Sequence, residues 1–198
     1  MYVKTNLDDL GLERTAVTVC DKEANPISQD PSVRSQGVDT LKKTLDCCQA
    51  LGAYALVGPL HSGLGVFSGK APSEHEWGWG VENLKKVSEH AGQCGVKLGI
   101  EFLNRFETYF LTCAADAAKF VKAIDHPSCC MMYDTFHAHI EEKDVADAIR
   151  SCANLSSMVL KSYVSDMDDA NLMCRPGEGC NHLAWQLGHL ISSEVQLL

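Results

Sequence analysis

Short apolar runs alternate along the chain with longer amphipathic segments. The short runs predict five strands, over residues 15–19, 54–58, 96–103, 129–135 and 157–164. Most of them are continuously apolar and do not alternate with polar residues, which is typical of parallel strands covered on both faces. The longer segments between them have the 3.6-residue period of helices, so strands and helices alternate.

Start and stop signals mark where these helices begin and end. Asp30 stands before a proline, as a helix N-cap does, and the amphipathic segment behind it ends at Gly52. The run SEHE from Ser73 matches a capping box and opens a second helix. Further helices are expected over residues 112–124, from residue 141 and, as a short segment at the end of the chain, from about residue 182.

This order predicts an α/β protein built from right-handed βαβ units. No linker or change in composition divides the 198 residues, so a single domain over residues 1–198 is expected. Periodicity alone leaves two architectures open, an open doubly wound sheet and a (β/α) barrel. Neither a G-x-G-x-x-G fingerprint nor a Walker loop follows any strand, so no nucleotide cofactor is expected.

Charge and composition narrow the choice of partners. The formal net charge of −9 disfavours nucleic acid or an anionic membrane as the main partner. No apolar run reaches the length of a membrane span, and the first residues lack the pattern of a secretory signal. The ten cysteines include no C-x-x-C pair, which favours reduced thiols in a cytoplasmic protein. A small disulfide between Cys174 and Cys180 is the alternative.

Carboxylates and imidazoles recur where consecutive predicted strands end. In chain order these polar residues are His61, Glu101, Asn104, Arg105, Glu107, Asp134, His137, His139, Tyr163, Asp166, Asp168 and Asp169. In a (β/α) barrel the carboxyl ends of the strands form the face that carries the active site. Several carboxylates with an imidazole suit a hard divalent cation such as Mn²⁺, Co²⁺ or Mg²⁺.

Each of these residues also has a plainer interpretation. Glu101, inside an apolar run, needs a partner because an ionised carboxylate is costly to bury, and Arg105 would supply one as a structural salt bridge. Asp134 would serve as a helix cap, and His139 as an ordinary loop residue. The interpretation as a site rests on the combination of these residues.

The pair Glu101 and Glu107 sets a geometric condition on such a site. Six residues apart, they would lie roughly 20 Å from each other in an extended strand. They share one site only if the chain turns after Asn104.

Two stretches of the sequence closely resemble a known family. GIEFLNRFETYF from Gly99 and MMYDTFHAHIEEKDVADAI from Met131 are similar to the D-tagatose 3-epimerase and D-psicose (allulose) 3-epimerase group of xylose isomerase-like TIM barrels. Supporting stretches are DPSVRSQGVDTLKKTLDCCQALGA, GPLHSGLGVFSG, and PGEG followed by Trp185. The resemblance covers nearly the whole chain and implies a barrel fold.

The resemblance also implies an activity and the residues that carry it. Members of this group are metal-dependent isomerases that epimerise ketoses at C3, by proton transfer through an enediolate that the metal stabilises. Carried over to this sequence, Glu101 is a catalytic residue and, with Asp134, a ligand of Mn²⁺ or Co²⁺. Glu107 and His137 bind the substrate, a ketose or related small carbohydrate. Family members often form dimers or tetramers, so a homo-oligomer is one expectation.

The sequence departs from the family pattern in its last third and in its length. Tyr163 stands where the family has a metal-binding histidine, Asp166 stands for a glutamate, and Asp169 stands where an arginine binds substrate. A complete barrel has roughly 250 residues. Relative to the family, the first two strands and the last strand are missing, so about five βα units of a partial (β/α)₈ barrel are expected.

These departures leave two alternatives to an active epimerase. One is a truncated paralogue or fragment, in which this chain by itself is weakly active or inactive. The other is a metal-dependent endonuclease of the same superfamily that acts on abasic DNA, which the acidic charge and the match at LNRFET disfavour.

Overall fold

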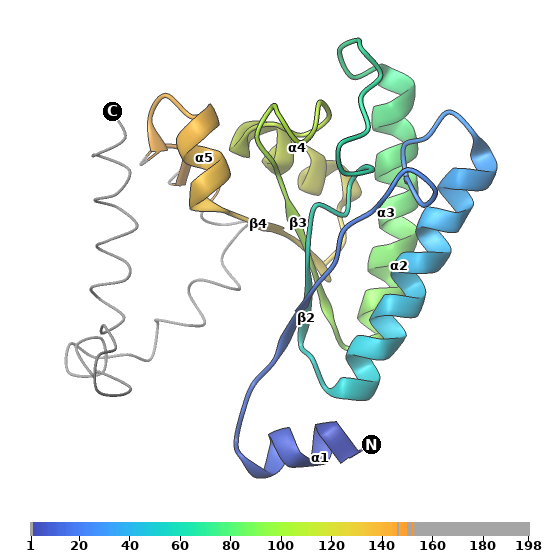
Figure 1. Cartoon of the computed structure of the whole chain (residues 1–198), viewed down its shortest axis with the longest axis vertical. Coiled ribbons are helices and arrows are strands. Elements are labelled where there is room, and N and C mark those ends of the chain that lie inside the picture. The colour runs from blue at the N-terminus through green and yellow to red at the C-terminus, as the bar shows by residue number, and fades with distance from the viewer. Residues whose placement is uncertain (1, 146, 150–151, 153–198) are drawn as a thin grey trace. The chain divides into compact units, whose positions relative to one another are not determined.

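Four parallel strands form the sheet of the described part of the chain, which in this computed structural model comprises residues 2–145, 147–149 and 152 (Figure 1). The strands are β1 (Thr15–Val17), β2 (Ala55–Gly58), β3 (Lys97–Glu101) and β4 (Cys129–Met132). They lie in the sheet in chain order, each paired with the next. A doubly wound sheet reverses this order at a switch point, whereas a barrel does not. Of the two architectures that periodicity left open, the strand order therefore favours the barrel over the doubly wound sheet.

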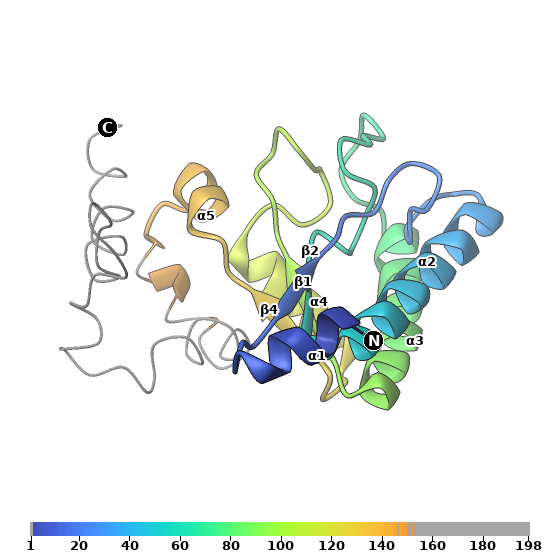
Figure 2. The ribbon, with the colours of Figure 1, turned by 60° about the horizontal axis from the view of Figure 1, so that its bottom comes forward.

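Helices precede and follow these strands. They are α1 (Tyr2–Asp9), α2 (Pro31–Leu51), α3 (Glu74–Cys94), α4 (Ala114–Ile124) and α5 (Thr135–Glu141). α2 and α3 lie side by side in both views, and α4 packs against α3 (Figures 1 and 2). The βα units expected from the sequence are thus present as far as the chain is described.

The predicted helix caps are confirmed. The Asp30 side chain accepts the N–H of Ser32, and Gly52 ends α2 in the left-handed conformation with φ of 73°. Ser73 and Glu76 form the predicted capping box at the start of α3. These local signals fix where both long helices begin and where α2 ends.

The two faces of the sheet have different neighbours. Leu56, Leu98, Ile100 and Met131 are fully buried and belong to the apolar core that the helices complete. Successive side chains of a strand point to opposite faces. Glu101 follows Ile100 and therefore lies on the face away from this core, which explains how an apolar strand can carry a carboxylate.

Two predicted boundaries near β4 are wrong. The strand expected to continue to residue 135 ends at Met132, and α5 begins at Thr135. The reason is Asp134, whose Oδ1 accepts the N–H of Phe136 at 2.7 Å and caps that helix. The helix expected from residue 141 is displaced, because α5 ends there and helical residues resume at Val145.

Several sequence-based expectations lie outside the described residues. They are the strand over residues 157–164, the short helix from about residue 182, the polar positions Tyr163, Asp166, Asp168 and Asp169, and the disulfide between Cys174 and Cys180.

Within the described part, none of the eight cysteines forms a disulfide. Burial raises the pKa of Cys20 and Cys129 to about 12, so these thiols pack as protonated, small apolar groups. None of the helices described here has the length and apolar character needed to cross a bilayer.

Gly58 provides a test of the packing between β1 and β2. It adopts φ of 133°, and a Cβ at this position would overlap the carbonyl oxygen of Thr18. We expect Gly58→Ala to lower the free energy of unfolding by about 1–3 kcal/mol. Gly78→Ala, inside α3 with no atom within 4 Å of the added Cβ, should instead raise it by about 0.5–1 kcal/mol. Equilibrium urea unfolding measures both, and equal effects of the two substitutions would contradict this account.

Candidate active site

Glu101, Asp134 and His137 converge at the carboxyl ends of β3 and β4. A carboxylate oxygen from each acid and a ring nitrogen of the histidine all lie within 4.8 Å of one another. Glu101 is the last residue of β3, and Asp134 and His137 lie at the start of α5. In the register of the sheet, Glu101 pairs with Met132, so β3 and β4 end side by side. Residues just beyond β4 therefore lie close to the Glu101 carboxylate. The structure thus brings together three residues that the sequence had singled out.

Glu101 lies in a strongly negative environment. Its side chain is buried, with only 7% of the residue exposed. Burial, the charge of Asp134, a hydrogen bond with Asp134 and the charge of Glu107 together raise the pKa of Glu101 to about 7. Among the described residues, its one basic partner within ion-pair distance is His137, whose Nε2 lies 3.8 Å from Oε1. The cluster therefore gathers more carboxylates than the basic groups of the described residues neutralise.

Arg105 does not neutralise Glu101, so the structural salt bridge considered above is wrong. Its guanidinium donates to both carboxylate oxygens of Glu141, with distances of 2.9–3.1 Å. Its backbone N–H donates to Oε1 of the same residue at 2.7 Å. Although burial acts in the opposite direction, Arg105 lowers the pKa of Glu141. This contact ties the loop after β3 to α5, and both of these segments carry residues of the cluster.

The chain turns after Asn104, as the shared site required. The backbone N–H of Glu107 donates to the carbonyl oxygen of Asn104 at 3.1 Å. The side-chain amide of Asn104 also donates to Oε1 of Glu107 at 2.7 Å. Glu107 is consequently held near Glu101, whose pKa it helps to raise.

Asn104 also fixes the orientation of His137. Its backbone N–H donates to Nδ1 of His137 at 3.1 Å, and its side-chain nitrogen lies 2.9 Å from the same atom. Because an N–H can only donate, Nδ1 acts as the acceptor, and in the neutral ring the proton is on Nε2. A histidine that binds metal through one nitrogen normally donates from the other. His137 is therefore arranged to donate from Nε2 toward the cluster, an arrangement that suits a substrate oxygen better than a metal ion.

Asn104 is a residue to which the sequence analysis gave no function. Its signal in the sequence is weak, because an asparagine after a strand is also an ordinary turn residue. In the structure it is buried and joins Glu107 to His137, which the sequence places 30 positions apart.

The two other histidines at strand ends stay outside this cluster. His61 follows β2, and its Nδ1 lies 2.8 Å from Oγ of Ser62. Burial lowers the pKa of His61 to about 3, although the backbone of Glu101 opposes this shift. The ring is thus neutral near pH 7 and adds no positive charge. His139 lies in the last turn of α5 and is partly exposed.

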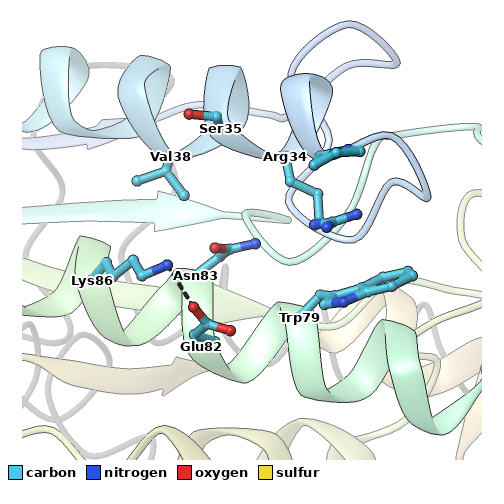
Figure 3. A pocket seen from close by; sticks show the side chains of 8 residues that line it. Arg34, Ser35, Val38, Trp79, Glu82, Asn83 and Lys86 are labelled. Carbon is cyan, nitrogen blue, oxygen red and sulfur yellow. Dashed lines mark hydrogen bonds and ion pairs between the residues drawn. The ribbon is translucent and has the colours of Figure 1, made fainter.

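A hollow on the outer side of α2 and α3 has a different character (Figure 3). The guanidinium of Arg34 lies over the ring of Trp79, 4.2 Å from its centroid. Lys86 pairs with Glu82 at 2.7 Å. Arg34, Lys86 and Glu82 in this hollow thus already have partners within the protein.

Comparisons with known proteins agree with this architecture. The family model described as xylose isomerase-like TIM barrel matches residues 2–193. The D-psicose 3-epimerase of Agrobacterium fabrum is 33% identical over 154 residues, which is 77% of this chain and 53% of that protein. The L-ribulose 3-epimerase of Mesorhizobium japonicum is 34% identical over 145 residues, 73% of this chain and 48% of that protein.

Solved structures give the same result. A structure of L-ribulose 3-epimerase has a TM-score of 0.74 at 32% identity, over 78% of this chain and 52% of that one. D-psicose 3-epimerase in the presence of D-fructose has a TM-score of 0.72 at 33% identity, over 77% and 53%. The chain spans about half the length of the curated relatives it matches. With a match over nearly all of its residues, the chain belongs to the xylose isomerase-like TIM barrel family.

Proposed function

We propose that this site transfers a proton at C3 of a ketose, the central step of 3-epimerisation, with a divalent cation held by Glu101 and Asp134. The observation that carries the proposal is the convergence of Glu101, Asp134 and His137 at adjacent strand ends, with Glu107 tied in through Asn104. The relatives named above are 3-epimerases of D-psicose and L-ribulose, which supports this substrate class. Together with the net charge of −9, they favour a sugar over abasic DNA.

The residues present fit a divalent cation. The buried Glu101 carboxylate, whose pKa is raised by burial and by the charge of Asp134, is stabilised when a cation neutralises the pair. Their oxygen atoms are the donors preferred by hard ions, so Mn²⁺, Co²⁺ and Mg²⁺ are the candidates. When bound, such an ion would stabilise the negative charge that develops on substrate oxygens as the proton leaves.

Each side chain then has a distinct part in the proposal. Glu101 removes the C3 proton and returns it, because a carboxylate held rigidly at a strand end can act as a general base. His137 donates from Nε2 to a sugar oxygen, and Glu107 accepts a hydrogen bond from a sugar hydroxyl. Asn104 is a positioning residue, since it orients both of these groups and is assigned no contact with the sugar.

Proton transfer at one face of the sugar does not by itself invert the configuration at C3. Inversion at C3 needs a proton removed from one face and returned on the other, hence a second acid. The described residues supply one carboxylate for this task, and the chain spans about half of its relatives' length. We therefore propose that this chain by itself exchanges the C3 proton with solvent but is weak or inactive in net epimerisation.

The raised pKa of Glu101 predicts a dependence of stability on pH in metal-free protein. The folded state binds the proton up to about pH 7, whereas an unperturbed carboxyl loses it near 4.5. The folded state thus binds more protons between these values, so stability falls as pH rises through this window. We expect a loss of about 1–2 kcal/mol, measured by urea unfolding in the presence of a chelator.

The substitution Glu101→Gln should remove this loss. The matched control is Glu89→Gln, which changes an exposed carboxylate of α3 and should leave the pH dependence intact. Parallel stability curves for the wild-type chain and Glu101→Gln would contradict the buried, negatively surrounded position of Glu101.

Exchange of deuterium into a sugar tests the proposed chemistry directly. The chain is incubated in D₂O with D-fructose or D-psicose and Mn²⁺, and the C3 position is followed by proton NMR. We expect deuterium at C3 with retention of configuration, and little conversion of one sugar to the other. Because Glu101 is the assigned base, Glu101→Gln should lower the exchange rate by at least about 100-fold.

The outcomes of this assay are distinct. Glu89→Gln should exchange like the wild-type chain. Absence of exchange in the wild-type chain, or unchanged exchange in Glu101→Gln, would contradict the proposal. Rapid net epimerisation would instead contradict the impaired state proposed for the chain by itself and show that it carries a second acid.

A further inference from the structure

A second group of metal-ligating side chains lies between α2 and α3. It consists of Asp46 on α2 and of His90 and Cys94 on α3, whose ligand atoms all lie within 4.8 Å of one another. Nε2 of His90 lies 2.7 Å from Oδ1 of Asp46. The Cys94 thiol donates to the same oxygen at 3.7 Å. Two side chains of one helix thus converge on a single carboxylate of its neighbour.

The helices bring these residues together for simple geometric reasons. His90 and Cys94 are four residues apart, so they lie on the same face of α3, one turn from each other. α2 and α3 each follow a strand of the same parallel sheet, so they run in the same direction and their carboxyl ends lie side by side (Figure 2). Asp46 lies near the end of α2 and Cys94 is the last residue of α3.

This location is separate from the candidate active site. In βα units the helices run back antiparallel to the strands, so the helix carboxyl ends lie at the opposite end of the sheet from the strand carboxyl ends. Glu101 ends its strand, whereas Cys94 precedes the start of the same strand. In barrels of this kind that opposite end serves stability and not catalysis.

The surroundings of the group favour a cation. The carboxyl end of a helix carries partial negative charge. Neither α2 nor α3 has a basic residue in its last turn to balance it. The Asp46 side chain is 59% exposed, so an ion can reach the group from solvent.

We propose that Asp46, His90 and Cys94 bind a zinc ion that fastens α2 to α3. One thiolate, one imidazole and one carboxylate are ligands that tetrahedral Zn²⁺ takes in proteins, with the fourth position left for water. Zinc bonds of about 2.0–2.3 Å require ligand atoms roughly 3.3–3.7 Å apart, so the three side chains need to shift by about 1 Å or less. On binding, Cys94 releases its thiol proton to solvent and His90 binds as the neutral ring.

The presence of a thiol distinguishes this group from the site at the strand ends. Glu101 and Asp134 offer oxygen atoms, which suit hard ions, whereas Cys94 adds a soft ligand that favours zinc. The plainer role is a hydrogen-bonded pair of His90 and Asp46 that joins the helices without metal. The two roles differ in one observable, the coordination of the Cys94 sulfur.

Cobalt is the probe that reports this coordination. The full chain, purified with reductant and freed of metal, is titrated with Co²⁺ while its absorption spectrum is recorded. We expect a thiolate-to-cobalt charge-transfer band that rises to a plateau as Co²⁺ is added and disappears when Zn²⁺ is added. Cobalt bound by Glu101 and Asp134 gives no such band, because no thiol belongs to that cluster. The result is therefore independent of the proposed function.

Matched variants identify the ligands. Cys94→Ser should abolish the band, whereas Cys47→Ser, which alters an exposed cysteine of α2 outside the group, should keep it. His90→Gln should weaken Co²⁺ binding at least about tenfold, since it removes one of three ligands. Zinc should raise the melting temperature of the wild-type chain and of Cys47→Ser by more than that of Cys94→Ser.

Three results would overturn the proposal. They are a wild-type spectrum without the band, a band that persists in Cys94→Ser, and unchanged affinity in His90→Gln. Circular dichroism checks that each variant is folded. If Cys94→Ser does not fold, His90→Gln decides the question by itself, because it leaves the thiol and the oxygen ligand in place.

Discussion

The described site depends on one constraint, the burial of the Glu101 carboxylate beside Asp134. β3 is apolar and packs Leu98 and Ile100 into the core, which leaves Glu101 on the other face of the sheet at the strand end. There its pKa rises to about 7, because burial and neighbouring carboxylates oppose its ionisation. Because these carboxylates repel one another, binding of a cation or of a proton between them is favourable. The repulsion that lowers stability in the metal-free chain thus supports the proposed chemistry.

The residues around Glu101 hold this arrangement in place. The turn after Asn104 brings Glu107 back toward the strand end, and the Asn104 side chain links it to His137. Arg105, which had seemed a partner for Glu101, instead fastens the same loop to Glu141 in α5. As a result Arg105 does not neutralise Glu101, while the loop and the helix that carry its neighbours are joined to each other.

The sequence predicted the parts of the fold that local signals determine. Asp30, Ser73 and Gly52 act through their own backbone and immediate neighbours, so the bounds of α2 and the start of α3 follow from a few residues. The start of α5 was missed because the strand was extended to residue 135, although the interpretation of Asp134 as a helix cap is confirmed. The sequence analysis treated helix cap and site residue as alternatives for Asp134, whereas in the structure Asp134 is both.

Contacts between distant residues were harder to predict. Arg105 and Glu141 are 36 positions apart, and His90 and Asp46 are 44 positions apart. Such pairs depend on the register of the sheet and on the packing of neighbouring helices. The resemblance of GIEFLNRFETYF and MMYDTFHAHIEEKDVADAI to an epimerase family pointed to Glu101, Asp134, Glu107 and His137 as one site. The donor orientation of His137, however, required the structure.

The central claim is that a divalent cation neutralises Glu101 and Asp134. The most direct measurement is anomalous X-ray diffraction from crystals of the chain soaked in Mn²⁺. The account predicts an anomalous peak at roughly 2.2 Å from a carboxylate oxygen of Glu101 and from one of Asp134. It also predicts that His137 stays directed by Asn104, outside bonding distance of that peak. The account would be contradicted if no peak appeared between the two carboxylates at saturating Mn²⁺ and their oxygens were still joined by a shared proton.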